Sequence, residues 1–215
     1  MIEICDDKQA TRPLYEEAFD DSPEFVDYYY EEKCLDNTIF VSRENNRIVA
    51  MLHLNPFTMN VCGHQTPVYY VVAVATTASE RHKKHMTRLF DAAFEHMKSK
   101  KVPFCFLMPV DERIYSWLGF ETITDFCADR IKDYATIQHS YDIYCVQDED
   151  YLRRMKKEMA LTALDKGEVL PDSPIIMAKV TDLERLSAIA GISFADEKQA
   201  LIWLKSKRIY ICEEV

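Results

Sequence analysis

Residues 71–86 join an apolar run to a basic loop and then to an amphipathic pattern. The run reads Val-Val-Ala-Val-Ala over 71–75, which is typical of a buried strand. A strand that enters a helix through such a loop directs free backbone N–H groups and the positive end of the helix dipole toward one point. This order favours a site for a pyrophosphate, and a plain strand–turn–helix with a solvated basic loop is the alternative. Apolar side chains recur at helical spacing after the loop, at Met86, Leu89, Phe90, Ala93, Phe94 and Met97.

The residues on either side of the basic loop indicate a β-α-β unit. Residues 67–75 and 102–108 are nearly all apolar, as expected of strands covered on both faces, and a helix over 86–100 joins them. We expect these two strands to be parallel, with a right-handed crossover. A short helix is predicted over 111–118, and Gly119 is well suited to end it.

Weaker patterns cover the rest of the chain. Residues 16–33 are predicted to form two short helices, the second capped by Ser22, and strands over 38–43 and 47–54 form a hairpin. Further elements are predicted as a strand over 141–146, a helix over 149–163, a connector over 167–174, a strand over 175–180, helices over 183–190 and 197–205, and a strand over 208–212.

Charge is distributed unevenly along a chain whose formal net charge is −10. Residues 1–40 hold twelve acidic and three basic side chains, whereas residues 81–101 hold two acidic and seven basic ones. An acidic surface beside a basic loop suits a cationic acceptor molecule and an anionic cofactor, although acidic helix faces that only keep a protein in solution give the same pattern. The negative overall sign argues against a nucleic-acid partner.

Cysteine and histidine spacings do not predict a metal site. The seven cysteines are scattered without a C-x-x-C pair, and the six histidines have no H-E-x-x-H spacing. We therefore expect reduced thiols and no metal. The residues that follow Met1 form neither a basic segment nor a long apolar run, so a cytoplasmic protein with no membrane partner is predicted. Homo-oligomer formation stays open.

Several short motifs together resemble one enzyme family. They are Val72-Ala-Val-Ala, Arg81-x-x-Lys84-x-Met86, the apolar run 104–109 and the segment 114–120, and residues 19–26 and 48–56 add to the match. In combination, over about residues 13–126, they resemble a GNAT-type N-acetyltransferase, and most of all the enhanced-intracellular-survival branch of that family. The resemblance implies an α/β fold of mixed α+β type, in which the parallel strands of a central mixed sheet splay apart to admit acetyl-CoA.

The resemblance also implies a division of the chain. Residues 1–135 would form the GNAT acetyltransferase domain, residues 136–170 a connecting strand and helix, and residues 171–215 a short C-terminal α+β extension. Longer relatives continue into a second acetyltransferase-like domain and a sterol-carrier-like domain. Because residues 176–184 and 208–215 look like the entry and exit of that last domain, the extension would be its remnant.

By the same resemblance, acetyl-CoA would be bound mainly by backbone groups. The splayed strands would leave the N–H groups of Val72 and Val74 unpaired, and the loop amides would face the pyrophosphate. Lys84 and Met86 stand where the family has glycine or another small residue. Since glycine adopts positive φ without a Cβ penalty, Lys84 would either supply a compensating charge or block the phosphate. The loop residues assigned to the cofactor are Arg81, His82, Lys83, Lys84, His85 and Met86.

Two catalytic residues follow from the resemblance. Tyr115 matches the tyrosine that related enzymes place beside the thioester sulfur, and its reference pKa of about 10 would keep it protonated as a general acid. Packing of Tyr115 against the sheet is the alternative. The branch uses a terminal carboxylate as the general base, which here would belong to Val215, with Glu213, Glu214, His53 and a water relay as alternatives.

The expected function is therefore direct transfer of acetyl from acetyl-CoA to a primary amine of a cationic small molecule. A GNAT-fold module that has lost catalysis and serves in binding or regulation is the second interpretation. A nucleotide ligand is disfavoured, because the sequence contains neither G-x-x-x-x-G-K-[ST] nor G-x-G-x-x-G.

Overall fold

The structure is a computed structural model that describes residues 1–130, 132–162 and 174–213. These residues fall into two compact units. The first unit comprises Met1–Asn55 and Val71–His96 together with the helix that follows Asp148. The second unit comprises Pro56–Tyr70, Met97–Gln147 and the described residues from Pro174 onward.

The sheet of the first unit begins with the predicted hairpin. Strand β1 (Ile2–Ile4) is antiparallel to β2 (Thr38–Glu44), and β2 is antiparallel to β3 (Arg47–Val61). The turn between β2 and β3 places Asn45 and Asn46 at φ +48° and +66°, a conformation that asparagine tolerates better than most residues. The hairpin prediction is thus confirmed, although β3 continues beyond the expected residue 54 to Val61.

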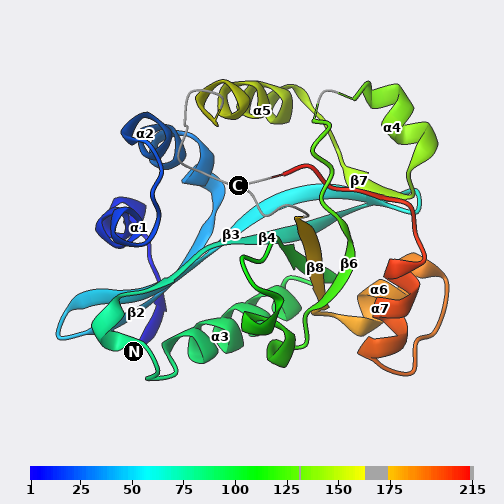
Figure 1. Ribbon diagram of the computed structural model, residues 1–215. Helices are drawn as coiled ribbons and strands as arrows, with labels where there is room; N and C mark the ends of the chain where they lie inside the picture. Colours follow the sequence, from blue (N-terminus) through cyan, green and yellow to red (C-terminus); the bar gives the residue numbers. More distant parts are fainter. Residues whose placement is uncertain (131, 163–173, 214–215) are drawn as a thin grey trace. The chain divides into compact units, whose positions relative to one another are not determined.

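The first unit also contains several helices (Figure 1). Among them are η1 (Lys8–Thr11), α1 (Arg12–Ala18), α2 (Pro23–Glu31), η2 (Lys33–Asp36) and α5 (Glu149–Thr162). The side chain of Ser22 caps α2, as predicted, by accepting a hydrogen bond from the N–H of Phe25 at 3.3 Å. The rings of Tyr15, Tyr29 and Tyr30 are buried together, and they form the aromatic part of the core of this unit.

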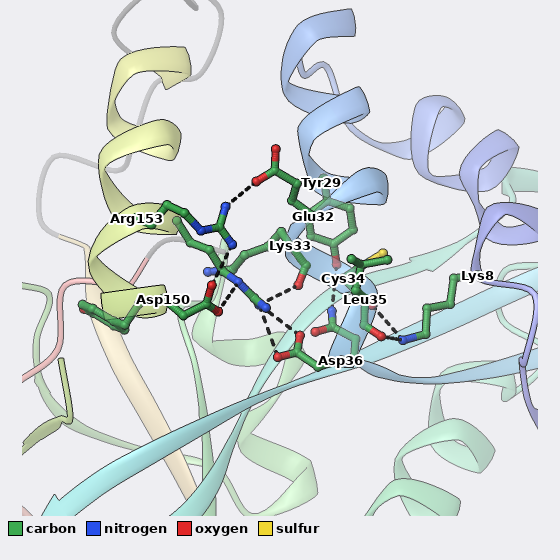
Figure 2. Close-up of polar contacts among 12 residues, drawn as sticks. Lys8, Tyr29, Glu32, Lys33, Cys34, Leu35, Asp36, Asp150 and Arg153 are labelled. Carbon is green, nitrogen blue, oxygen red and sulfur yellow. Dashed lines mark hydrogen bonds and ion pairs between the residues drawn. The ribbon is translucent and has the colours of Figure 1, made fainter. Parts of the chain in front are cut away.

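Ion pairs hold α5 against the end of α2 (Figure 2). Glu32 accepts a hydrogen bond from Arg153 at 2.7 Å and also pairs with Lys157. Beneath these exposed contacts, Lys33 and Glu158 form a buried pair at 3.4 Å. The contact of α5 with α2 therefore combines two kinds of ion pair. Those of Glu32 are partly exposed and are weakened by salt, whereas the Lys33–Glu158 pair is buried and is screened much less.

The predicted parallel pair is confirmed in the second unit. Strand β4 (His64–Thr76) lies parallel to β5 (Phe104–Leu107), with Tyr69 opposite Cys105 and Tyr70 opposite Phe106. The connection between them contains η3 (Ala78–Glu80) and α3 (His85–Ser99). Pairing of β4 with β5 covers only these two positions, so β4 continues beyond Tyr70 without β5 as a hydrogen-bonding neighbour.

The strand predicted over 175–180 completes the sheet of the second unit. Strand β8 (Ile175–Val180) lies between β5 and β6 (Glu121–Asp125) and is antiparallel to both, with Ala178 opposite Phe106 and Glu121. The described strands follow one another in the order β1-β2-β3-β4-β5-β8-β6. Strand β7 (Ile143–Cys145) pairs with β3, and β9 (Ile209–Tyr210) pairs with β7. Helices α6 (Leu183–Ala190) and α7 (Glu197–Lys205) follow β8.

Two local elements differ from the sequence prediction. Residues 111–118 form two 3₁₀ turns, η4 (Glu112–Ile114) and η5 (Ser116–Leu118), instead of one helix. The hydroxyl of Ser116 donates to the Glu112 carbonyl at 2.7 Å, and such local bonds compete with a regular helix. Helix α4 (Tyr134–Ser140), which no periodicity predicted, starts at an Asp133 cap.

Within the described ranges, no helix is both long and apolar enough to span a membrane.

Candidate functional site

The end of β4 presents one half-exposed row of side chains. Val71, Ala73 and Ala75 are buried, whereas Val72 and Val74 are partly exposed, as expected where strand residues alternate between two faces. Ala73 has φ +51°, which is rare for a non-glycine residue inside a strand and turns the local backbone out of the regular pleat. The strand end is then fixed by a hydrogen bond of 2.9 Å from the Thr77 N–H to the Val49 carbonyl.

The basic loop after η3 adopts glycine-like backbone angles without containing glycine. His82 and Lys84 both have φ +63°, in the left-handed region. At position 84 we expected the lysine either to supply a compensating charge or to block a phosphate. The loop takes the left-handed conformation in spite of the lysine, at a cost of about 1 kcal/mol for each non-glycine residue held there.

The backbone amides of this loop are available to a ligand. Among the residues that the structure describes, the N–H groups of residues 82–86 donate no hydrogen bond to protein. The last of them belong to the first turn of α3, which contains no acidic residue that would compensate the helix dipole. Free N–H groups and an uncompensated positive dipole end are the features of a helix N-terminus that binds phosphate.

Side-chain charge at the loop is mainly positive. Arg81, Lys83 and Lys84 are exposed, and the one acid beside them, Glu80, accepts a hydrogen bond from Lys83 at 2.8 Å. That hydrogen bond holds the pKa of Glu80 below its usual value, so Glu80 stays ionised. Arg81 donates from Nε to the Thr76 carbonyl at 3.3 Å, which keeps its guanidinium at the start of the loop.

The side chain of His85 lies inside the protein, unlike its neighbours in the loop. It is 2% exposed, and its Nδ1 lies 2.8 Å from the Oγ of the buried Ser42. His85 therefore offers the loop its backbone N–H but not its imidazole. Met86 is partly exposed at the first turn of α3.

Two residues that the sequence analysis missed contact the loop from other elements, Ser42 from β2 and Arg88 from α3. Ser42 contacts His85 across 43 positions of sequence, and no local pattern could have revealed this contact. Arg88 donates to the carbonyls of Lys83 and Lys84 at 3.1 and 3.3 Å. The helix dipole disfavours a cation in the first turn of a helix. An arginine at position 88 was therefore the one sequence signal that its side chain has another role, here to bind the loop carbonyls.

Tyr115 lies in the second unit, between η4 and η5. It is 9% exposed, its ring packs edge-on against Phe120 at 6.1 Å, and burial raises the pKa of its hydroxyl to about 12. Tyr115 is therefore protonated at neutral pH. A cavity of about 420 Å³ lies along the same segment, lined by residues 109–113 together with Pro174 and Ile175.

Of the residues considered as the general base, the structure describes His53 and Glu213. His53 is fully buried, its Nδ1 lies 2.8 Å from the Tyr29 hydroxyl, and burial lowers its pKa to about 3. A histidine with so low a pKa takes up a proton poorly at neutral pH. Glu213 is buried and its Oε2 accepts a hydrogen bond from the Cys212 N–H at 3.0 Å. Glu214 and Val215 lie outside the described residues.

Comparisons with known proteins point to one family. The family model described as an acetyltransferase (GNAT) domain matches residues 5–123. A GCN5-related N-acetyltransferase from Anabaena variabilis has a similar structure, with a TM-score of 0.59 and 11% identity over 86% of this chain and 74% of its own. The ribosomal-protein-S18-alanine N-acetyltransferase from Escherichia coli gives a TM-score of 0.50 and 12% identity over 85% of this chain and 94% of its own.

A third solved structure is longer than this chain. It is a probable N-acyltransferase from Enterococcus faecalis, with a TM-score of 0.55 and 16% identity over 58% of this chain. The match spans 33% of the length of the Enterococcus protein. No curated protein matches the sequence. At these identities, the likeness to solved structures shows the fold alone.

Proposed function

Because the chain belongs to the family of GNAT acetyltransferase domains, we propose that it transfers the acetyl group of acetyl-CoA directly to a primary amine. The observation that carries this proposal is the loop over residues 82–86, whose backbone N–H groups are free and whose Lys84 takes a glycine-like conformation. An anion with several acceptor oxygens, such as a pyrophosphate, satisfies several of these amides together.

The chemistry of the loop fits the phosphate end of acetyl-CoA. The free amides receive the pyrophosphate oxygens, and the exposed charges of Arg81 and Lys83 add charge-assisted contacts. Val72 and Val74, on the half-exposed row of β4, offer their backbone to the part of the cofactor that carries the thioester. In this proposal, backbone geometry does most of the binding, so the lysine at position 84 is compatible with it.

Acetyl transfer then needs one proton acceptor and one proton donor. The neutral amine attacks the thioester carbon, a C–N bond forms and the C–S bond breaks. The amine gives up a proton to the base, and the leaving thiolate takes the proton of the Tyr115 hydroxyl, which is replaced from solvent. By its resemblance to the enhanced-intracellular-survival branch, we assign the base to the carboxylate of Val215.

Charge supports a cationic acceptor molecule. Residues 1–40, all in the first unit, carry twelve acidic and three basic side chains. Asp20 and Asp21 lie between α1 and α2, and the Tyr15 hydroxyl donates to Asp21 at 2.7 Å. At least five of the twelve acids form ion pairs with basic side chains, so the attraction for a positively charged amine would come from the others, Asp20 among them.

Calorimetric titration with acetyl-CoA and CoA, followed by an amine library assayed for thiol release, tests the proposal. We expect saturable binding of both ligands and acetylation of at least one polycationic amine. The competing function, a binding or regulatory module without catalysis, is favoured by the strain that His82 and Lys84 add to the loop. Thiol release from an amine supports the transferase, whereas absence of acetyl-CoA binding, or binding without thiol release from any amine, contradicts it and supports the module.

A further inference from the structure

We propose that His85 is a positioning residue, whose buried imidazole ties the pyrophosphate loop to strand β2 and sets the direction of the loop amides. The inference rests on the proposed function, because it assigns the part of the loop that acetyl-CoA would contact. His85 would touch no reacting atom; it would act through the backbone of residues 83–85.

The first observation is where His85 is held. Its neighbours in the loop are exposed, yet His85 is 2% exposed and Ser42, on β2, is fully buried. The Ser42 Oγ and the His85 Nδ1 are 2.8 Å apart. A buried polar contact between side chains so distant in sequence fixes the loop against a strand that belongs to the same unit.

The second observation is what Arg88 does beside it. Its Nη2 lies 3.3 Å from the His85 Nδ1 and 3.1 Å from the Lys83 carbonyl, and its Nε lies 3.3 Å from the Lys84 carbonyl. A guanidinium can only donate, so in this contact the His85 Nδ1 is the acceptor, and Nε2 is the other ring nitrogen. That Nε2 is directed toward Glu80, with 3.7 Å between Nε2 and the nearer carboxylate oxygen. One imidazole thus contacts groups from β2, η3 and α3.

These contacts decide where the amides point. In a trans peptide, the C=O and the N–H point in opposite directions. Because Arg88 holds the carbonyls of Lys83 and Lys84, the N–H groups of Lys84 and His85 must point away from Arg88. The Lys84 carbonyl is also held by the Arg88 backbone N–H at 3.2 Å, whereas the Lys83 carbonyl depends on the guanidinium that His85 Nδ1 contacts. His85 thus helps to keep the Lys84 N–H directed outward for a pyrophosphate.

The test compares CoA with pantetheine, which lacks the pyrophosphate together with the 3′-phosphorylated adenosine of CoA. We expect His85→Ala to weaken CoA binding about tenfold, the effect of losing roughly one well-placed hydrogen bond, and to leave pantetheine binding unchanged. Because 3′-dephospho-CoA keeps the pyrophosphate, it should lose the same affinity as CoA in this variant. His85→Asn, whose Oδ1 can replace Nδ1 as the acceptor, should restore most of the CoA affinity. Binding is measured by calorimetry for CoA and by ligand-observed NMR for pantetheine.

Ser42→Ala removes the same contact from the strand side without changing the loop sequence. We expect it to weaken CoA binding in the same direction, and the double variant with His85→Ala to show less than the sum of the two effects. Equal losses for CoA and pantetheine, additive effects, or no loss for CoA in either variant would overturn the inference. Failure of the unaltered protein to bind CoA would instead contradict the proposed function.

Discussion

Replacing Lys84 by glycine tests the idea that backbone conformation, not the lysine side chain, makes the phosphate loop. Lys84 is held at φ +63°, where a residue with a Cβ is less stable than glycine by about 1–2 kcal/mol. Glycine loses more entropy on folding, about 0.5–1 kcal/mol. We therefore expect Lys84→Gly to raise the free energy of unfolding by up to about 1.5 kcal/mol, and the melting temperature by up to about 5 °C.

The same chain offers a matched control. Lys101 is also an exposed lysine in the left-handed region, at φ +58°, where it follows the C-terminal end of α3. Lys101→Gly should therefore change the melting temperature by a similar amount, measured by calorimetry. Only Lys84→Gly should act on the loop, and we expect its CoA affinity to equal or exceed that of the unaltered protein because the free amides are kept.

Two results would refute this reasoning. If Lys101→Gly stabilises the protein and Lys84→Gly destabilises it, the lysine at position 84 is not strained but held by contacts that the loop needs. If Lys84→Gly and Lys84→Ala both lose more than about tenfold in CoA affinity, the ammonium group is itself a phosphate ligand. The site would then depend on side-chain charge and not on the glycine-like backbone.

Four further experiments follow from the site and the fold. Tyr115→Phe should lower turnover about 10²-fold with little change in acetyl-CoA affinity, and an unchanged rate would leave the tyrosine a packing role. Appending a few residues after Val215 should abolish turnover but not acetyl-CoA binding, so normal turnover by the extended protein would exclude that carboxylate as the base. Burial lowers the pKa of His53 from 6.5 to about 3. Between these two pH values the unfolded chain binds a proton at His53 and the folded protein does not. The free energy of unfolding should fall by roughly 4 kcal/mol between pH 6.5 and 3, and His53→Gln should flatten that slope in urea titrations; parallel slopes would contradict this. Glu32→Gln should lower the urea midpoint in low salt but not in 1 M salt, because its two cationic partners are partly exposed, whereas Glu31→Gln, an exposed neighbour, should have no effect at either ionic strength.

The strand, loop and helix over residues 64–99 were predictable from sequence because their signal is local. The apolar run ending at Ala75 and the helical stripe from Met86 each cover enough residues to define a period. The parallel pairing of β4 with β5 followed from that order, since a β-α-β connection favours it.

Three features could not be predicted from the sequence, because each depends on distant residues or on a single backbone angle. The left-handed angle at Lys84 is imposed by the surrounding contacts, against the preference of lysine. The Ser42–His85 contact joins positions 43 apart, and the local patterns of a single sequence do not indicate such a pair. The placement of β8 between β5 and β6 is likewise a tertiary choice, because an apolar run indicates a strand but not its neighbours.

The position of β8 has a consequence for how the protein is made. A ribosome synthesises β5 and β6 well before β8, so the nascent chain holds two strands whose shared neighbour does not yet exist. Until Ile175–Val180 emerges, both edges that β8 will occupy are open to pairing with other chains. Pairing across so long a separation is also slow, because loop closure precedes any gain from the contacts. The segment matched by the family model ends at residue 123, inside β6 and before β8, so a fragment cut there would keep the edge of β5 open permanently. Residues after the family match are therefore needed to close the edge of β5.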